Sequence, residues 1–349
     1  MPNEPLVSVV IPAYKAASRI RETLDSVYAQ TYPNFEIVLV NDGSPDTEEL
    51  EEAIRGYDQR LIYIKQENKG PSAARNAAIR TAHGQYIACL DSDDIYLPEH
   101  LARLLSHIER NGLTLAYSDC YFMRDGVHVG TSFEREPQDP PVTFEKLLTE
   151  DCCISTSAMM ASRQAMIDAG LFDESYRRCE DFDLWLRMCF RGAKMDLVSD
   201  VGVVHRLIAD GLAADPYLLS LARVEVYKKT ITTLPLSPEQ KRLVERLIAQ
   251  TLGHSEMLLV KRHLRSRRYP EARAAAGNAA RALGGIKPLA LVIALRVAPW
   301  AVRWYMGSRD VSASLRRQAP RLVTKDQADI GNMKRQSELP LQSKAEIKR

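Results

Sequence analysis

Short apolar runs alternate with longer amphipathic segments through the first third of the chain. A run of about five apolar residues is typical of a buried strand, whereas apolar residues spaced three or four positions apart indicate a helix. This pattern predicts strands at 7–11, 36–40, 61–65, 86–90 and 115–121, and helices at 17–28, 46–55, 72–81 and 101–108. Strands that alternate with helices predict an α/β fold with a mostly parallel sheet and flanking helices.

Three of the predicted strands end in polar clusters, at residues 12–14, 41–43 and 91–93. In open parallel sheets, ligands bind beyond the carboxyl ends of the strands. The three clusters are therefore expected to meet in one binding site. Neither a G-x-G-x-x-G nor a G-x-x-x-x-G-K-[ST] loop is present, so the phosphates of a nucleotide would be held by a metal ion and side chains.

Three carboxylates follow the predicted strand at 86–90 within four residues: Asp91, Asp93 and Asp94. On an extended backbone, alternation would aim Asp91 and Asp93 the same way. Two adjacent carboxylates repel each other unless a cation lies between them, and Mg²⁺ or Mn²⁺ commonly shares such ligands with a diphosphate. A solvated acidic turn ahead of a helix is the alternative, with Asp94 supporting the turn or capping the segment after it.

The composition, with 349 residues of which 45% are hydrophobic and 26% charged, is that of a soluble protein able to bury a core. The net charge of +2 does not point to a nucleic-acid partner. Six cysteines form no C-x-x-C pair, which favours buried free thiols in a reducing compartment. Residues 1–5 do not resemble a secretory signal, and no apolar run reaches the roughly 20 residues that span a bilayer, so we expect a cytoplasmic protein.

Four blocks of the chain resemble the family 2 glycosyltransferases, in order and at family-like spacing. They read Val-Ser-Val-Val-Ile-Pro-Ala-Tyr at 7–14, Ile-Val-Leu-Val-Asn-Asp-Gly-Ser at 37–44, Asn-Lys-Gly-Pro-Ser-Ala-Ala-Arg-Asn at 68–76 and Asp-Ser-Asp-Asp at 91–94. The resemblance covers about residues 5–210. It implies a GT-A fold, a nucleotide-diphospho-sugar donor, a divalent metal (Mn²⁺ or Mg²⁺) and transfer with inversion at the anomeric carbon.

The resemblance assigns the nucleotide-binding roles residue by residue. Pro12 and Tyr14 would line the base pocket, with Tyr14 packing on the ring. Asp42 would accept a hydrogen bond from the base, expected to be the N3–H of uracil, and Arg75 would reach the base and phosphates. The residues alone also allow a half-buried strand-end Tyr14, an Asx-turn at Asp42 and an exposed helical Arg75.

The same resemblance places the metal and the sugar near the acidic turn. Asp91, Ser92 and Asp93 would bind the nucleotide sugar, with Asp91 on the ribose or the metal and Asp93 on the metal directly. His205, after a predicted strand at 201–204, would complete the metal shell or touch the diphosphate. The family often has Tyr-Arg ahead of this histidine where this chain has two valines, and a satisfied strand-end histidine is the alternative.

A helix is predicted to begin near Asp181, because apolar residues recur from 182 to 189 at helical spacing. Residues 180–187 resemble the family block E-D-x-D-L-W-L-R, whose aspartate serves as base, so Asp181 is predicted to be the general base and Glu180 its substitute. Transfer requires such a base to take the acceptor's proton opposite the departing diphosphate. The alternative for both carboxylates is stabilisation by the helix dipole, and Trp185 is expected in the core.

The predicted domains are a GT-A catalytic domain at 1–215, a helical region at 216–285, an apolar and basic segment at 286–322 and a disordered tail at 323–349. Long helices are expected at 218–232, 238–264 and 270–283, and residues 208–216 are expected to form a loop that closes over the donor. From 287 onward the chain has 13 Lys/Arg against 5 Asp/Glu, which would attract anionic lipid.

Residues 288–306 are apolar but interrupted by two arginines and a proline. On one continuous helix, Arg296 and Arg303 would share a stripe with Trp300 and Trp304 beside it, an arrangement that suits a membrane interface. A helix packed on its neighbours, or a dimer contact, is the alternative.

The sequence as a whole predicts an inverting, metal-dependent glycosyltransferase that moves a sugar, from a UDP-sugar by preference, to a hydroxyl of a glycan or a lipid-linked acceptor. It is expected to act in polysaccharide synthesis at the cytoplasmic face of the membrane, without a nucleic-acid partner. A sugar nucleotidyltransferase and a non-catalytic, membrane-associated scaffold of the same fold are the alternatives. The first would normally carry a glycine-rich loop after the first strand, and the second would be expected to lack Asp93 or Asp181.

Overall fold

The computed structural model describes residues 4–57, 59–208, 215–284 and 286–308. The predicted tail at 323–349 and residues 309–322 of the apolar and basic segment lie outside these ranges. Most of the predicted donor-closing loop, residues 209–214, lies outside them as well.

The described part of the chain contains one sheet, in the strand order β3-β2-β1-β4-β8-β6-β9-β5, with β7 paired to β6. Parallel pairing joins β1 to β2 and β4, β2 to β3, and β6 to β9, so the sheet is mostly parallel as predicted. The antiparallel strand β8 lies between β4 and β6 and connects the two parallel halves. The strands are β1 (Val7–Ala13), β2 (Phe35–Asp42), β3 (Leu61–Gln66), β4 (Tyr86–Cys89), β5 (Ile95–Tyr96), β6 (Leu115–Arg124), β7 (Val127–Thr131), β8 (Met159–Ser162) and β9 (Met195–Arg206).

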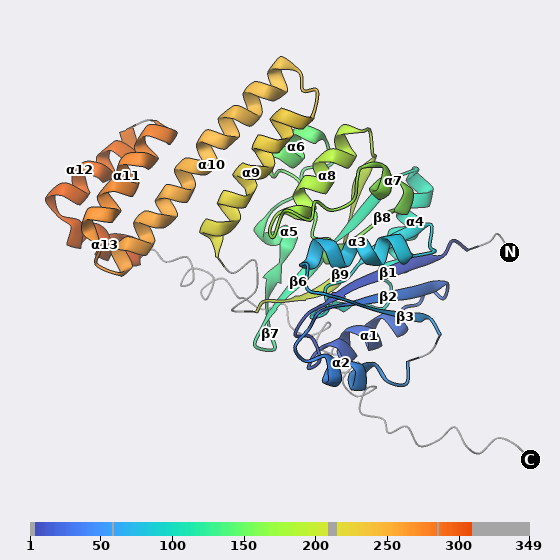
Figure 1. Ribbon diagram of the computed structural model, residues 1–349. Helices are drawn as coiled ribbons and strands as arrows, with labels where there is room; N and C mark the ends of the chain where they lie inside the picture. Colours follow the sequence, from blue (N-terminus) through green and yellow to red (C-terminus); the bar gives the residue numbers. More distant parts are fainter. Residues whose placement is uncertain (1–3, 58, 209–214, 285, 309–349) are drawn as a thin grey trace, which may run out of the picture. The chain divides into compact units, whose positions relative to one another are not determined.

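Alternation along the central strands sends side chains to two separate cores. Val9 and Ile11 join one buried cluster with α1 (Ile20–Tyr28), α2 (Thr47–Ile54) and α4 (His100–Asn111). Val10 points to the opposite face and joins the cluster that includes α3 (Pro71–Thr81). Figure 1 shows α3 on one side of the sheet and α1 and α2 on the other. The first strand is buried on both faces, which explains why its sequence is apolar except for Ser8.

The second half of the catalytic region supplies short helices around β8. They are α5 (Ser132–Arg135), α6 (Phe144–Thr149), the 3₁₀ turn η1 (Thr156–Ala158), α7 (Arg163–Asp168) and the longer α8 (Glu180–Phe190). Helix α8 begins one residue before the predicted start, and Trp185 is buried in the core as expected.

The C-terminal helices α9 (Pro216–Thr233), α10 (Pro238–Arg265) and α11 (Tyr269–Leu283) match the predicted spans closely. Three side chains of this region, Val226, Tyr227 and Val244, belong to the same buried cluster as the α3 face of the sheet. Of the described residues, those up to Arg303 form one compact unit, and residues 304–308 are not part of it. Within the described ranges, no helix is both long enough and apolar enough to cross a membrane.

The apolar segment after α11 is not one helix, which corrects the prediction for 288–306. Helix α12 (Ile286–Val297) ends before Ala298, and α13 (Pro299–Ser308) begins with a proline. Proline has no N–H to continue the hydrogen-bond ladder, so the helix breaks there. The continuous stripe that would have joined Arg296 to Arg303 is therefore absent.

Candidate active site

The Asp42 carboxylate, at the end of β2, is buried and held by the next strand–helix connection. Its Oδ1 accepts from Gln66 Nε2 at 2.7 Å and from the Lys69 N–H at 2.9 Å. Its Oδ2 accepts from the Gly70 N–H at 2.8 Å. None of these three donors is in its own turn, so the Asx-turn alternative for Asp42 was wrong. The carboxylate is a fixed acceptor, and its two oxygens offer about four lone-pair sites, which leaves capacity for one more donor.

The Asx-turn role belongs to the preceding residue, which the sequence analysis did not single out. Asn41 Oδ1 accepts from the Ser44 N–H at 2.9 Å, and Asn41 Nδ2 donates to Tyr63 OH at 2.9 Å. Ser44 Oγ in turn accepts from the Lys15 N–H at 2.7 Å. These bonds tie the turns after β1 and β2 together. In the sequence, the block Asn-Asp-Gly-Ser at 41–44 could have indicated this Asx-turn at Asn41.

Tyr14 lies just beyond β1 and is 48% exposed, which is compatible with the half-buried alternative and leaves one part of the ring accessible. The ammonium of Lys15 is 5.5 Å from the centre of the Tyr14 ring. Lys15 has a left-handed backbone, with φ of 53°, which is uncommon for a residue with a side chain. An exposed ring held at a strand end can stack on a flat base.

Arg75, in the first half of α3, is buried, so the exposed-arginine alternative was wrong. Its Nη2 is 2.6 Å from Asp91 Oδ1, and its Nη1 is 2.7 Å from Glu180 Oε1. Burial opposes the charge on Arg75, but Asp91 and Glu180 together raise the pKa of Arg75 above its ordinary value. Burial raises the pKa of Glu180, and the charge of Arg75 opposes that shift. One guanidinium thus joins the acidic turn to the start of α8.

The acidic segment is a turn and not an extension of β4, which corrects the alternation argument for Asp91 and Asp93. Strand β4 ends at Cys89, and the Asp94 N–H donates to the Asp91 carbonyl at 3.0 Å. The hydroxyl of Thr23, on α1, donates to the carbonyls of Ser92 at 3.0 Å and Asp94 at 2.9 Å. The direction of each carboxylate is therefore set by the turn and by α1.

Asp94 is fully buried and anchors the end of β9 with its side chain. Its Oδ2 is 2.9 Å from His205 Nδ1, and its Oδ1 accepts from the Arg206 N–H at 3.1 Å. Burial lowers the pKa of His205, but Asp94 and its acidic neighbours outweigh it and raise that pKa to about 9. The backbone of Asp94 supports the turn as predicted, whereas its side chain holds the histidine.

Asp93 forms no ion pair among the described residues. Burial raises the pKa of Asp93 to about 6, the neighbouring carboxylates of Asp94 and Asp91 add to the shift, and the charge of His205 opposes it. Oxygen ligands and excess negative charge suit a hard divalent cation, and a histidine whose Nδ1 faces a carboxylate keeps Nε2 for a metal. Among the described residues, no group of three acidic, histidine or cysteine side chains is already arranged to hold a metal ion.

Three carboxylates lie in the first turn of α8, in different environments. Glu180 pairs with Arg75, and Asp183 pairs with Arg187 at 2.7 Å and with Lys229 of α9 at 2.9 Å. Asp181 accepts only neutral donors: the hydroxyl of Thr156 at 2.8 Å on Oδ2, and the adjacent Phe182 N–H at 2.7 Å on Oδ1. In the part of the chain that the structure covers, no cation pairs with Asp181.

Part of the segment 152–157 was expected to line the acceptor cleft, but no residue of it could be singled out, because the segment has no distinguishing pattern beyond three hydroxyl side chains. Thr156 contacts Asp181, and Ser157 Oγ accepts from the Asp91 N–H at 3.1 Å. Both residues are buried.

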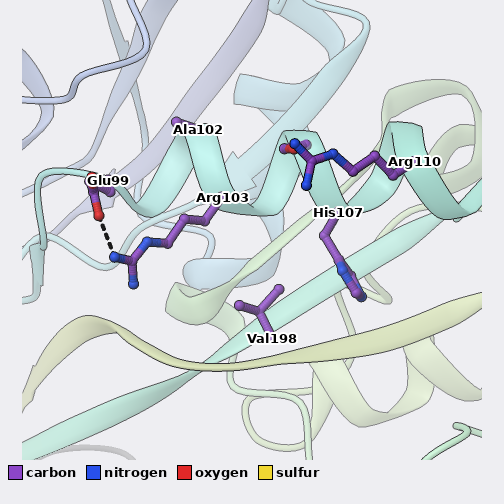
Figure 2. A pocket seen from close by; sticks show the side chains of 7 residues that line it. Glu99, Ala102, Arg103, His107, Arg110 and Val198 are labelled. Atoms are coloured by element: carbon purple, nitrogen blue, oxygen red, sulfur yellow. Dashed lines mark hydrogen bonds and ion pairs between the residues drawn. The ribbon is translucent and has the colours of Figure 1, made fainter.

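Two open surface pockets lie elsewhere. One, of about 440 Å³, lies between α4 and β9 (Figure 2), where Arg103 bonds to Glu99 and His107 Nε2 is 3.1 Å from Asp196. The other, of about 690 Å³, is lined by residues 113, 140–142 and 194–197. Neither contains a predicted site residue, so the candidate site rests on the contacts above.

Comparison with solved structures identifies the fold. The fold resembles residues 1–349 of Staphylococcus aureus TarS, crystallised with UDP-GlcNAc, with a TM-score of 0.59 and 20% identity, over 79% of this chain and 81% of that one. It also resembles the mannosyltransferase PcManGT of Pyrobaculum calidifontis, solved with GDP-Man and Mn²⁺, with a TM-score of 0.57 and 19% identity, over 88% and 84% of the two chains. The protein has the GT-A fold of glycosyltransferases.

Comparison with known sequences identifies the family of the protein. The profile described as "Glycosyl transferase family 2" matches residues 8–169. An uncharacterized glycosyltransferase of Methanocaldococcus jannaschii is 30% identical over 231 residues, which are 64% of this chain and 77% of that protein. The Escherichia coli UDP-Glc:alpha-D-GlcNAc-diphosphoundecaprenol beta-1,3-glucosyltransferase WfaP is 30% identical over 225 residues, 64% of this chain and 86% of that protein. The chain belongs to glycosyltransferase family 2.

Other relatives are longer: the alignment with a Rickettsia felis glycosyltransferase, 34% identical over 197 residues, covers 31% of that protein. Family membership favours the glycosyltransferase prediction over the nucleotidyltransferase and scaffold alternatives.

Proposed function

We propose that this glycosyltransferase moves a sugar from a UDP-sugar to a hydroxyl of a glycan or lipid-linked acceptor, with inversion at the anomeric carbon. Asp181 is the proposed base, with Glu180 as its substitute, and Mn²⁺ or Mg²⁺ is the proposed cofactor. One observation carries the proposal: Arg75 bonds Asp91 of the acidic turn and Glu180 beside Asp181. The acidic turn and the start of α8 therefore lie next to each other, which supports a site in which the donor-side acids and the base act on one substrate.

The nucleotide would bind across the ends of β1 and β2. The exposed ring of Tyr14 offers a stacking surface beside Pro12, and the fixed carboxylate of Asp42 offers an acceptor for the N3–H of uracil. Uracil is favoured because the relative WfaP is named for UDP-Glc and the TarS structure contains UDP-GlcNAc. Arg75 and Ser92 would lie on the side of the ribose and phosphates.

Asp93 and Asp91, with His205, are the residues that would hold the divalent ion, which when bound stabilises the charge on the departing diphosphate. The absence of an ion pair at Asp93 among the described residues and the orientation of His205 by Asp94 support this assignment. The mannosyltransferase PcManGT was solved with Mn²⁺, which is consistent with it.

Asp181 is the carboxylate best suited to accept the acceptor's proton. The carboxylates of Glu180 and Asp183 are held in ion pairs with Arg75, Arg187 and Lys229, whereas Asp181 is held by neutral donors. In the proposed step, the acceptor oxygen bonds to the anomeric carbon as the bond to the diphosphate breaks, and the proton moves to Asp181. A single displacement inverts the configuration.

The test combines binding with turnover on the full chain. Asp181→Asn should keep the Mn²⁺-dependent thermal stabilisation by UDP but lose release of UDP from UDP-glucose or UDP-N-acetylglucosamine, because the base acts only in the chemical step. Asp93→Asn should lose the Mn²⁺ dependence of stabilisation. Wild-type turnover by Asp181→Asn would exclude it as the base, and an absence of stabilisation by any UDP compound would exclude the proposed donor.

We further propose that α12 lies on an anionic membrane surface, on the cytoplasmic face, where a lipid-linked acceptor would be found. Leu289, Ile293 and Val297 recur every four residues on α12 and are 56%, 57% and 80% exposed, and Trp300 is 71% exposed. Residues 286–308 contain three Lys or Arg and no Asp or Glu. An exposed apolar row with cationic surroundings suits a lipid interface.

Sedimentation with phosphatidylglycerol vesicles tests this contact. Ile293→Ser with Val297→Ser should weaken vesicle binding, whereas Val127→Ser, at a valine on β7 that is 62% exposed, should not. Phosphatidylcholine vesicles should bind less than anionic ones. A concentration-dependent dimer in light scattering that the double variant abolishes, with no vesicle binding, would assign the face to a second copy of the chain.

A further inference from the structure

We propose that Thr156 is a positioning residue for Asp181, and that the turn η1 sets the base in place relative to the donor-side acids. The inference rests on the proposed role of Asp181 as the base. It adds a residue, outside the motif blocks, that acts through the carboxylate and does not itself touch the substrate.

The contact between Thr156 and Asp181 is specific and partly buried. The Thr156 hydroxyl donates to Asp181 Oδ2 at 2.8 Å, and its side chain is shielded from solvent. The other oxygen, Oδ1, accepts from the Phe182 N–H. With a donor on each oxygen the carboxylate has one preferred orientation, yet each oxygen retains a lone-pair site for the acceptor's proton.

A hydroxyl can hold a base in place without cancelling its charge. The neighbouring Glu180 and Asp183 are held in ion pairs with cations, which occupy their carboxylates. Asp181 is oriented by neutral groups instead. A general base needs this combination, because the reacting groups must be aligned while the carboxylate still takes up a proton.

The turn that carries Thr156 is anchored on the donor side. The next residue, Ser157, is 1% exposed, and its Oγ accepts from the Asp91 N–H at 3.1 Å. The turn is closed by the Ala158 N–H on the Ser155 carbonyl at 3.0 Å and runs directly into β8. Adjacent residues of one short turn thus contact the segment of the proposed base and the segment of the donor-side acids.

The backbone on the Asp181 side of the contact, at the start of α8, is also constrained. Cys179, immediately before α8, has a left-handed backbone with φ of 58°, a conformation that side-chain-bearing residues rarely adopt without tertiary support. The first turn of α8 is therefore fixed by its surroundings, and Thr156 supplies the contact that reaches Asp181.

The test is Thr156→Val, which keeps the shape and removes the hydroxyl. We expect kcat for UDP release from UDP-glucose or UDP-N-acetylglucosamine with Mn²⁺ to fall about 10- to 100-fold, the loss of one hydrogen bond to a charged group. KM for the donor and the thermal stabilisation by UDP should not change, because the donor does not contact Thr156. Thr156→Ser should restore most of kcat, and Thr156→Ala replaces the valine variant if that variant does not unfold cooperatively.

Two further variants separate positioning from a general loss of stability. Thr230→Val removes another buried threonine hydroxyl, which donates to the Val226 carbonyl in α9, and should keep wild-type kcat. Combined with Asp181→Asn, Thr156→Val should cause no further loss, because its effect passes through that carboxylate.

The inference and the proposed function can fail separately. If Asp181→Asn abolishes turnover but Thr156→Val keeps wild-type kcat, the positioning role is wrong and the base assignment stands. If Thr156→Ser loses as much as Thr156→Val, the hydroxyl is not what matters and the inference is likewise wrong. Wild-type turnover by Asp181→Asn, or no turnover of either donor by the native protein, would overturn the proposed function and the inference with it.

Discussion

At the residue scale, some carboxylates of the candidate site form ion pairs and others do not. Arg75 compensates two carboxylates, Asp91 and Glu180, and it is itself buried. Burial, together with the carboxylates of Asp94 and Asp91, raises the pKa of Asp93 to about 6, and Asp93 forms no ion pair among the described residues. An acid without an ion-pair partner has room for a cation, which is why the metal is proposed there.

Arg75 should be needed for stability as well as for binding. Arg75→Met would leave Asp91 and Glu180 without a counter-charge, which for a buried pair costs about 3–5 kcal/mol in the free energy of unfolding, measured with urea. Arg75→Lys should be intermediate, because an ammonium cannot bond both carboxylates with the geometry of a guanidinium. Arg80→Met on the same helix, 60% exposed and 3.8 Å from Glu174, should cost less than about 1 kcal/mol. Equal losses for Arg75→Met and Arg80→Met would contradict this account.

His100 should make the fold sensitive to acid. Burial lowers the pKa of His100 to about 3, below its ordinary value of 6.5. Between these values the unfolded chain binds a proton that the folded chain does not, so this residue lowers the unfolding free energy by up to about 1.4 kcal/mol per pH unit as pH falls.

Urea unfolding at several pH values from 7 to 4 measures this dependence. His100→Gln should flatten the curve, whereas His254→Gln, at an exposed position on α10, should leave it unchanged. The same slope in wild type and His100→Gln would show that other groups cause the acid sensitivity.

At the scale of elements, the connections after β2 and β3 work as one unit. The loop at 68–70 supplies two backbone N–H groups to Asp42. Gly43, in the turn after β2, has φ of +61°, and a Cβ there would lie 2.6 Å from the Asn68 nitrogen. The turn and the loop fit together only because this position lacks a side chain.

Gly43→Ala should therefore displace the loop that holds Asp42. We expect weaker UDP binding by about tenfold, or 1.4 kcal/mol, in titration calorimetry. The reason is that the Asp42 carboxylate, the proposed hydrogen-bond acceptor for uracil, would move. Gly112→Ala is the matched control, since Gly112 has φ of +58° and open space around its Cβ position. It carries the same backbone strain without the clash, so it should reduce stability but not UDP affinity. Unchanged UDP affinity in Gly43→Ala would separate this turn from the nucleotide site.

At the scale of the whole molecule, the C-terminal helices contribute to the catalytic core. Val226 and Tyr227 of α9 and Val244 of α10 are buried in the cluster that covers the α3 face of the sheet. The Tyr227 hydroxyl donates to the Leu148 carbonyl at 2.7 Å, and Lys229 bonds Asp173 at 2.7 Å. Helix α9 thus completes the same core that supports α8 and Asp181.

A chain that ends at residue 215 should lose cooperative thermal unfolding, because it exposes the apolar surface that α9 and α10 cover. A chain that ends at residue 284, after α11, should retain it together with stabilisation by UDP. Circular dichroism during heating measures both. Cooperative unfolding of the 1–215 chain would show that the catalytic region is an independent domain.

The sequence by itself determined the local elements. Apolar runs and helical spacing depend on neighbours a few residues apart, so they located the central strands, α8 and the burial of Trp185. The motif blocks indicated the family, which the comparisons confirm, and with it the residues proposed for the site. Predictions from the local pattern were wrong at two places where a regular element ends. These are the turn at Asp91 and Asp93 and the helix break before Pro299.

Only the tertiary structure decided which side chains meet. Arg75 and Glu180 are 105 residues apart, Asp94 and His205 are 111 apart, and Thr156 and Asp181 are 25 apart. No periodicity connects such pairs, because the register of the sheet and the packing of α3, η1 and α8 bring them together. Whether a carboxylate is compensated, oriented or left unbalanced depends on those contacts, and that difference separates Asp181 from Glu180 and Asp183.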